Sequence, residues 1–169
     1  MTTPRPPLNV LFLCTHNSAR SILAEALLNA MGNGRFRAYS AGSSPRPHQQ
    51  PHPLGLQVLQ KAGIPTDGLR SKSWDEFATA DAPAMDLIVT VCDSAAGEVC
   101  PIWPGHPATA HWGYADPSAG DGSDEAQLEA FRFTLLALKR RLEQLINLPE
   151  EKLEKAALQA TARALAAHA

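Results

Sequence analysis

Two short apolar runs constrain the fold of this chain more than any other feature of its sequence. Residues 8–13 are LNVLFL, residues 86–91 are DLIVTV, and a cysteine directly follows each run, Cys14 in one case and Cys92 in the other. Runs of this length and composition are typical of strands buried on both faces, as in parallel sheets covered by helices. The two runs therefore predict a parallel β-sheet.

Helical patterns alternate with strand-like runs along the rest of the chain. Further strands are predicted at residues 37–41 and 110–112, and helices at residues 22–30, 53–62 and 128–145. Gly32 and Gly63 are expected to end the first two helices, and Ser123 to cap the third. This order predicts an open, doubly wound α/β sheet of four parallel strands with helices on both faces. Binding sites in such sheets lie at the carboxyl ends of the strands.

The length of the chain suits one domain with an additional helix. The chain has 169 residues, of which 44% are apolar, an ordinary share for a globular protein. Residues 1–7 are predicted to form a flexible N-terminus, residues 8–147 an α/β catalytic domain and residues 148–169 a C-terminal helix. This helix either docks on its own domain or contacts another subunit, and local docking is favoured because terminal helices commonly dock locally.

Charge and hydropathy exclude several classes of protein. The formal net charge is −2 and the chain has no block of lysine and arginine, so a nucleic-acid partner is not expected. The apolar run after the proline-rich N-terminus is too short for a signal peptide or a membrane span. We therefore expect a cytoplasmic protein without a membrane contact. Its three cysteines would stay reduced there and suit catalysis or metal binding better than structural disulfides.

The segment between the first strand and the first helix is the strongest candidate for chemistry. It consists of Cys14, Thr15, His16, Asn17, Ser18, Ala19, Arg20 and Ser21. Backbone N–H groups of such a loop, with a helix N-terminus behind them, can converge on an anion. The same groups and Arg20 would stabilise a nucleophilic thiolate at Cys14. The planar guanidinium of Arg20 can also bind two oxygens of a phosphate-like substrate.

The alternative is that Cys14 is only a small buried hydrophobe at the end of a strand. A cysteine after an apolar strand, an arginine six residues later and a helix that starts at once form a combined pattern that favours a functional site. Ser18 and Ser21 are then expected to orient the loop or to donate to the sulfur, and Asn17 to lock the loop backbone.

The loop from Cys14 to Ser21 resembles the anion loop of the low-molecular-weight tyrosine phosphatases and of the arsenate reductases that share their fold. The resemblance extends over about residues 8–145 and implies the phosphatase-like fold. Asp116-Pro117 is similar to the general-acid loop of that family, in which a carboxylic acid protonates a leaving oxygen. The alternative for this pair is an ordinary turn.

Two features favour a reductase over a phosphatase within this resemblance. Phosphatases of the fold carry aromatic residues directly after the Asp-Pro pair, whereas residues 118–120 are Ser-Ala-Gly here. Reduction of arsenate needs two electrons, which one thiol cannot supply without a second. By resemblance, Cys14 attacks arsenate, Cys92 attacks Cys14 as arsenite leaves, and Cys100 attacks Cys92 to present a disulfide to thioredoxin.

The resemblance does not decide the reductant, which is either thioredoxin or the combination of glutaredoxin and glutathione. One extra residue lies between Cys92 and Cys100 compared with the best-known thioredoxin-linked members, and His16 replaces their loop glycine. The implied function is reduction of arsenate to arsenite in arsenic detoxification, with phosphate or sulfate as substrate mimics. The alternatives are a phosphatase acting on phosphotyrosine or a small phosphate ester, and a non-catalytic oxyanion sensor. In these cases Cys92 and Cys100 would be inert residues beside the sheet.

No tightly bound cofactor is expected, but some reductases of this family hold a potassium ion behind the anion loop. The matching positions here are Asn17, Glu25, Ser40 and Asp75. Oxygen ligands of this kind suit a hard cation, although each residue also has a structural explanation. A zinc site is not expected, because no CxxC pair is present and His48 and His52 lie in a proline-rich loop, where both should be solvated.

Overall fold

The computed structural model describes residues 7–93, 97, 108–119, 122–149 and 162–166. Its elements in chain order are β1 (Leu8–Cys14), α1 (Arg20–Met31), β2 (Phe36–Gly42), α2 (Pro53–Lys61), the 3-10 helix η1 (Trp74–Phe77), β3 (Leu87–Thr90), β4 (Ala108–His111) and α3 (Asp124–Ile146). Residues 162–166 are helical as well.

The strands form one four-stranded parallel sheet with the order β2-β1-β3-β4. The central strand β1 pairs with β2 from Leu8 opposite Phe36 to Cys14 opposite Gly42. Because all the strands are parallel, their carboxyl ends meet at one edge, where the loop after Cys14 begins. The predicted four-stranded parallel α/β sheet is confirmed.

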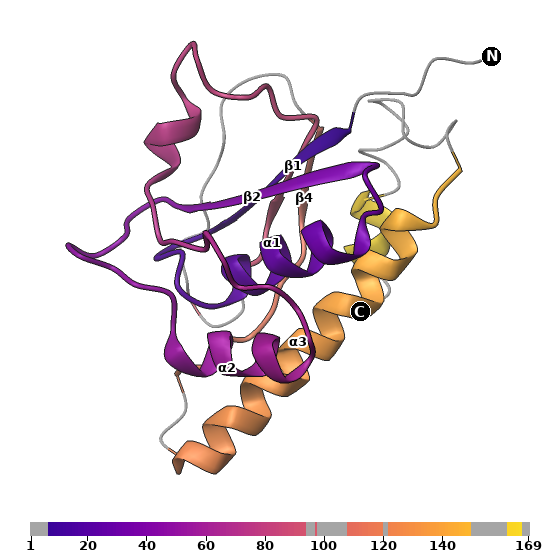
Figure 1. Cartoon of the computed structure of the whole chain (residues 1–169). Helices are drawn as coiled ribbons and strands as arrows, with labels where there is room; N and C mark the ends of the chain where they lie inside the picture. The colour runs from indigo at the N-terminus through magenta and orange to yellow at the C-terminus, as the bar shows by residue number, and fades with distance from the viewer. Residues whose placement is uncertain (1–6, 94–96, 98–107, 120–121, 150–161, 167–169) are drawn as a thin grey trace.

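Helices cover the two faces of the sheet unequally (Figure 1). The α-helices α1, α2 and α3 share one core with Val10 and Phe12 of β1. On the opposite face, Leu11 and Leu13 of the same strand belong to a smaller cluster that packs against Trp74 and Phe77 of η1. The alternation of side chains along β1 thus buries both of its faces, as expected for a central strand of a covered sheet.

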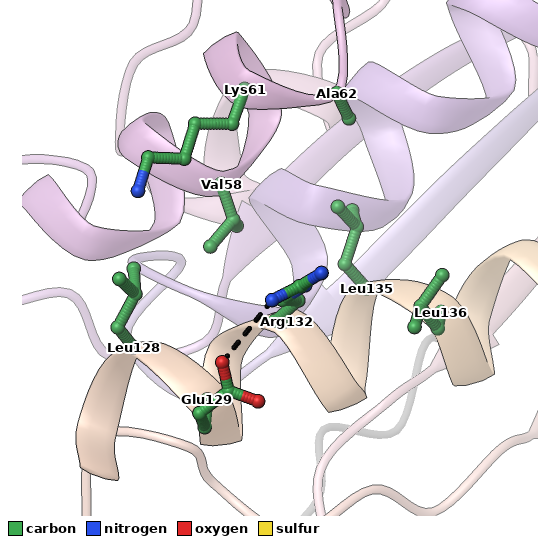
Figure 2. Close-up of a pocket in the computed structure, with 8 residues that line it drawn as sticks. All are labelled: Val58, Lys61, Ala62, Leu128, Glu129, Arg132, Leu135 and Leu136. Carbon is green, nitrogen blue, oxygen red and sulfur yellow. Dashed lines mark hydrogen bonds and ion pairs between the residues drawn. The ribbon is translucent and has the colours of Figure 1, made fainter. Parts of the chain in front are cut away.

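The helices α2 and α3 pack against each other and leave a cavity of about 370 Å³ between them at the surface (Figure 2). Val58 of α2 and Leu128 and Leu135 of α3 supply apolar walls. On α3, Glu129 and Arg132 form an exposed ion pair at 3.3 Å. None of the residues that line this cavity belongs to the segment 14–21.

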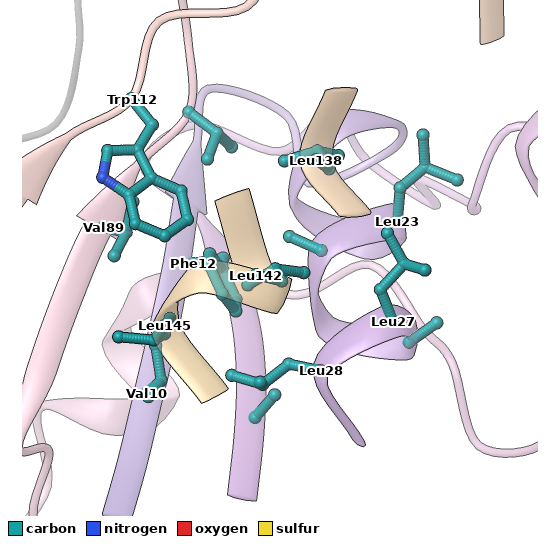
Figure 3. Packing of buried hydrophobic residues seen from close by; sticks show 14 of the residues in the cluster. Val10, Phe12, Leu23, Leu27, Leu28, Val89, Trp112, Leu138, Leu142 and Leu145 are labelled. Carbon is teal, nitrogen blue, oxygen red and sulfur yellow. The ribbon is translucent and has the colours of Figure 1, made fainter. Parts of the chain in front are cut away.

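Figure 3 shows the part of this core that the sheet, α1 and α3 form. Its labelled members are Val10, Phe12, Leu23, Leu27, Leu28, Val89, Trp112, Leu138, Leu142 and Leu145. The rings of Phe12 and Trp112 lie 6.4 Å apart between centroids. Full burial of one such large side chain contributes about 1.5–3 kcal/mol, so this face supplies most of the hydrophobic stabilisation.

Residues 162–166 dock on this same domain, next to β4. The Trp112 Nε1–H donates to the Ala162 carbonyl at 2.9 Å, and Arg163 Nε donates to the Thr109 carbonyl at 3.2 Å. Ala162 and Leu165 are buried in the main core. Within the described part of the chain, no helix combines the length and the apolar character needed to cross a bilayer.

The boundaries differ from the predicted ones in places that have a physical reason. Ser123 caps α3 as predicted, with its Oγ accepting from the Ala126 N–H at 3.2 Å. β4 starts at Ala108, two residues earlier than predicted, because the pairing of Ala108 with Leu87 extends the ladder into a sequence with little intrinsic β-preference. The 3-10 helix η1 has no apolar periodicity and was not predicted.

Candidate active site

The anion loop, defined as residues 14–21, joins β1 to α1 at the carboxyl edge of the sheet. Gly42, at the end of β2, lies so close to this loop that a Cβ there would be 2.7 Å from the Thr15 carbonyl oxygen and 2.9 Å from the His16 carbonyl carbon. The Ser43 N–H donates to the Cys14 carbonyl at 3.1 Å. The loop therefore rests directly on the end of β2, and this contact requires glycine at position 42.

The thiol of Cys14 lies within the anion loop. Cys14 is a free cysteine and is only 3% exposed. Its Sγ lies 2.8 Å from Ser21 Oγ and accepts a hydrogen bond from the Asn17 N–H at 3.2 Å. Asn17 has a φ of 57°, a left-handed conformation that asparagine adopts more readily than most residues. Both contacts are made by the Cys14 sulfur, the atom that the sequence predicts to be the nucleophile.

The side chain of Asn17 sets the direction of these hydrogen bonds. Its Oδ1 accepts from the backbone N–H of Lys72 at 3.0 Å, and its Nδ2 donates to Ser21 Oγ at 2.7 Å. Because Ser21 Oγ accepts this bond, its own proton is available for Cys14 Sγ. Asn17 and Ser21 are both fully buried, so water does not compete for these contacts.

Arg20 connects the anion loop to the loop that contains Asp116. Arg20 is 5% exposed, and its Nη1 donates to the Tyr114 carbonyl at 2.9 Å. Its Nη2 lies 3.9 Å from Asp116 Oδ2. The other carboxylate oxygen, Oδ1, accepts from the N–H and the Oγ of Ser118 at 2.9 and 2.7 Å. The structure therefore places the proposed general acid beside the proposed anion clamp.

The N-terminus of α1 opens onto the same loop. Ala19 occupies its N-cap position without a side-chain hydrogen bond, and the first turn contains no acidic residue. The first N–H groups of an α-helix have no partner within the helix, so they can donate to an anion. The Ser18 carbonyl accepts from the His52 N–H at 2.9 Å, which ties the loop to the segment before α2.

Cys92 lies at the same edge of the sheet, just after β3. The Val91 N–H donates to the Leu13 carbonyl at 2.9 Å, so the chain leaving β3 runs beside the end of β1. Cys92 is fully buried and disulfide-bonded, while Cys14 is free. The sulfur partner of Cys92 lies outside the described residues, and so does Cys100, the third cysteine of the predicted relay.

Of the four residues predicted to hold a potassium ion, the structure brings Glu25 and Ser40 into direct contact. Ser40 Oγ donates to Glu25 Oε1 at 2.5 Å, and Lys72 Nζ lies 4.0 Å from the same oxygen. Asn17 Oδ1 is bonded to the Lys72 backbone, whereas Asp75 is exposed on η1. Among the residues that the structure describes, no group of three His, Cys, Asp or Glu side chains could hold a metal ion.

Burial perturbs both charged groups of this region. Burial raises the pKa of Glu25 above its usual value of 4.5, although the hydrogen bond from Ser40 and the charge of Lys72 act in the opposite direction. Burial also lowers the pKa of Lys72 from 10.5, and here the charge of Glu25 opposes the shift. Lys72 is a residue that sequence reasoning missed, because its contact with Asn17 spans 55 residues and no motif marks it.

The prediction that His52 is a solvated loop residue is wrong. His52 is the N-cap of α2, and its Nδ1 accepts from the Leu54 N–H at 3.2 Å. Its ring lies 4.7 Å from the ring of Phe131, between centroids, which leaves it half-buried. His48 is exposed, as predicted. A polar residue directly before the helix-initiating Pro53 was the signal that could have revealed this cap.

These features form the arrangement that the sequence predicts for a cysteine-dependent oxyanion site on a parallel α/β sheet. Cys14 lies in the loop between β1 and α1, Arg20 follows in the same segment, and Asp116 lies 3.9 Å from Arg20. Comparison with known proteins identifies the class of protein that has this fold and this site.

The low molecular weight phosphotyrosine protein phosphatase family matches residues 9–160 of the chain. The arsenate reductase of Halalkalibacterium halodurans is 33% identical over 123 residues, which are 73% of this chain and 84% of the relative. The structure of the arsenate reductase from Archaeoglobus fulgidus is 29% identical with a TM-score of 0.66, covering 82% of this chain and 99% of that one. The thioredoxin-dependent arsenate reductase of Corynebacterium glutamicum is 27% identical with a TM-score of 0.54, covering 85% and 65%.

The chain therefore belongs to the low molecular weight phosphotyrosine protein phosphatase family. The relatives and solved structures named above are arsenate reductases that are similar to it over most of its length. The family resemblance inferred from the segment Cys14 to Ser21 is confirmed.

Proposed function

We propose that this protein is an arsenate reductase in which Cys14, Cys92 and Cys100 form a thiol–disulfide relay. The observation that carries the proposal is the presence of two sulfur sites at one edge of the sheet. Cys14 is free within the anion loop, and Cys92, just after the neighbouring strand, is disulfide-bonded. Hydrolysis of a phosphate ester requires no second cysteine. The names of the relatives, which are arsenate reductases, support the same reaction.

The first step forms a covalent bond between Cys14 and arsenic. Arsenate binds to the backbone N–H groups of the loop and of α1, and the guanidinium of Arg20 holds two of its oxygens. The Cys14 thiolate attacks arsenic, and one arsenic–oxygen bond breaks. The departing oxygen leaves as water after taking up protons, one of them from Asp116. Arsenic is still As(V) in this adduct, because no electron pair has been transferred to it.

The second step reduces arsenic. The Cys92 thiolate attacks Cys14 Sγ, a sulfur–sulfur bond forms, and the electron pair of the sulfur–arsenic bond stays on arsenic, which leaves as arsenite, As(III). The Cys100 thiolate then attacks Cys92 Sγ, and Cys14 departs as a thiolate. The disulfide between Cys92 and Cys100 now carries the two oxidising equivalents. A disulfide-bonded Cys92 beside a free Cys14 is the combination expected at this stage of the cycle.

A dithiol reductant must return this disulfide to the reduced state, and we assign that role to thioredoxin. The similar enzyme of Corynebacterium glutamicum is described as thioredoxin-dependent, and glutaredoxin with glutathione is the alternative reductant to test. A relay that ends on such a dithiol operates in a reducing compartment, so we place the enzyme in the cytoplasm. Its role there is the conversion of arsenate during arsenic detoxification.

A phosphatase is the second candidate, because the family includes phosphotyrosine phosphatases. Hydrolysis would use only Cys14, Arg20 and Asp116. The position after Asp116-Pro117 carries Ser118, whose Oγ donates to the Asp116 carboxylate at 2.7 Å, and no aromatic side chain follows it through residue 120. This loop offers no ring platform for phosphotyrosine, which favours a small oxyanion as substrate.

The test is arsenate-dependent NADPH oxidation with thioredoxin and thioredoxin reductase, combined with single-turnover arsenite yields. We expect continuous turnover by the unaltered protein and none by Cys14→Ser, Cys92→Ser or Cys100→Ser. Without added reductant, Cys100→Ser should release about one arsenite per chain, because Cys92 can still attack Cys14, whereas Cys92→Ser should release none.

The two yields separate the relay from hydrolysis. The protein is a phosphatase if two results occur together. The unaltered protein would produce no arsenite with either reductant, and Cys92→Ser and Cys100→Ser would still hydrolyse p-nitrophenyl phosphate. Equal arsenite yields from Cys92→Ser and Cys100→Ser would contradict the assigned order of attack. The Cys14→Ser variant controls for reaction of arsenate with the other two thiols.

A further inference from the structure

A buried contact between a lysine and a glutamate supports the anion loop. Lys72 Nζ lies 4.0 Å from Glu25 Oε1, and the two side chains are only 8% and 15% exposed. Ser40 of β2 donates its hydroxyl proton to the same carboxylate oxygen at 2.5 Å. Lys72 Nζ also donates to the Arg70 carbonyl at 2.8 Å. The ammonium group of Lys72 thus links Glu25 of α1 to the backbone of Arg70, in the segment that precedes η1.

The backbone of Lys72 contacts the loop that holds the nucleophile. Its N–H donates to Asn17 Oδ1 at 3.0 Å, and its carbonyl accepts from the Gly42 N–H at 2.9 Å. Asn17 in turn donates to Ser21 Oγ, which lies 2.8 Å from Cys14 Sγ. Lys72 therefore joins the charged contact at Glu25 to the hydrogen bonds that surround the thiol.

Glu25 needs a positive charge beside it, because a buried carboxylate without a partner is strongly unfavourable. Arg70 is the other cation whose charge acts on Glu25. However, Arg70 is 60% exposed and forms a two-pronged pair with Glu76 at 3.0 and 2.5 Å. Lys72 is thus the buried partner of Glu25 among the residues that the structure describes here.

The oxygens predicted to bind potassium have other partners in this chain. Asn17 Oδ1 accepts from the Lys72 N–H, Glu25 faces the Lys72 ammonium, and Asp75 is exposed. A potassium ion requires several oxygen lone pairs directed at one point, whereas an ammonium group supplies the same charge by donating hydrogen bonds. The arrangement therefore does not fit a metal ion and does fit a lysine.

We propose that the side chain of Lys72 is the built-in cation of the anion loop and takes the place that a dissolved potassium ion would have. Lys72 is a positioning residue. Its ammonium group neutralises Glu25, which fixes the backbone at position 72. This backbone then holds Asn17 and, through Asn17 and Ser21, the thiol of Cys14. Activity, thermal stability and thiol reactivity should consequently not depend on potassium. The activity readout rests on the proposed arsenate reduction, whereas the other two readouts require no arsenate.

The first experiment compares the unaltered protein in potassium chloride and in choline chloride at equal ionic strength. We expect the same thermal midpoint, the same rate of Cys14 alkylation by iodoacetamide and the same arsenite production in both salts. A higher midpoint or faster alkylation in potassium chloride alone would overturn the proposal, because it would reveal a site for the metal ion. Failure of arsenite production with unchanged midpoint and alkylation would count against the proposed reaction only.

The second experiment removes the ammonium group and keeps the backbone contact to Asn17. Loss of one partner of a buried ion pair in a chain of 169 residues should lower the thermal midpoint of Lys72→Met by roughly 6–20 °C. The rate of Cys14 alkylation by iodoacetamide should fall as well, and both losses should be the same in potassium chloride and in choline chloride. Lys72→Arg should retain both properties. Lys61→Met, at an exposed lysine, is the matched control and should change neither.

A double variant covers the case in which Lys72→Met does not fold. Glu25→Gln combined with Lys72→Met removes both charges, so it should be more stable than Lys72→Met alone. A Lys72→Met protein that matches the unaltered protein in midpoint and alkylation would overturn the proposal. A double variant no more stable than the single one would do the same, since Lys72 would then act through packing alone.

Discussion

Substitution of Gly42 by alanine should disrupt the anion loop although Gly42 is not part of it. The added Cβ would lie 2.7 Å from the Thr15 carbonyl oxygen, 2.9 Å from the His16 carbonyl carbon and 3.0 Å from the Asn17 nitrogen. All three are backbone atoms, so no side-chain rotation can relieve the contacts. Optimal separations between carbon atoms are about 3.5–4.0 Å, which implies a displacement of the loop by roughly 0.5 Å or more.

The expected cost follows from this displacement. Overpacking of a well-packed site costs about 1–3 kcal/mol, which lowers the thermal midpoint of a protein of this size by roughly 2–12 °C. A shift of about 1 Å in a group that positions the reacting atoms can reduce the rate about 100-fold. We therefore expect Gly42→Ala to weaken phosphate binding at least about tenfold and to reduce turnover more than stability alone would suggest.

Calorimetric titration with phosphate and thermal unfolding test this prediction. Gly55→Ala is the matched control, because a Cβ at Gly55 would lie 3.5–3.8 Å from side-chain atoms of Phe131 and Leu23, an ordinary contact distance. Gly55 is inside α2, where alanine is favoured over glycine by about 0.5–1 kcal/mol. The control should keep the phosphate affinity and raise the midpoint. Unchanged phosphate binding by Gly42→Ala would refute the reasoning about the loop.

Three further predictions concern other parts of the site and its support. Ser21→Ala removes a hydroxyl 2.8 Å from Cys14 Sγ, so alkylation of Cys14 by iodoacetamide at neutral pH should slow about tenfold; Ser43→Ala should leave the rate unchanged. Asp116→Asn should reduce arsenite production about 100-fold or more without changing the alkylation rate. Deletion of residues 162–169 removes the acceptor of the Trp112 indole N–H, so the thermal midpoint should fall by about 2–12 °C and tryptophan emission should shift to the red. A deletion that leaves both unchanged would show that the contact adds no stability.

The central strands and the anion loop could be predicted because their signals are local. The run before Cys14 is apolar on both faces of β1, and the cysteine and Arg20 lie within one loop of the chain. Neither signal depends on distant residues. The edge strand β4 and the 3-10 helix η1 were harder to predict from the sequence. Pairing with β3 determines where β4 forms, and packing on Leu11 and Leu13 determines where η1 forms. Tertiary contacts thus override weak local preference.

The support of the loop could not be predicted for the same reason. Lys72 follows no periodic pattern, and its side chain has a role only because the fold places it beside Glu25 on α1. Gly42 is similar: the sequence shows a glycine at the end of a strand, but the approach of Thr15 to its Cα depends on the path of the anion loop. By contrast, the role of His52 was available locally, from its position directly before Pro53.

The proposed chemistry requires a nucleophile that stays in place and a second thiol that exchanges partners. The contacts that hold Cys14 come from Asn17, Ser21 and the end of β2, and none of them involves Cys92. Cys92 is bonded to another sulfur and fully buried, so its disulfide must be reduced and its segment must move before the Cys92 thiolate can attack Cys14. Because the loop has its own anchors, this movement need not disturb the bound anion. Substitutions at the anchors should therefore change anion affinity, whereas substitutions at Cys92 should change only the steps that follow binding.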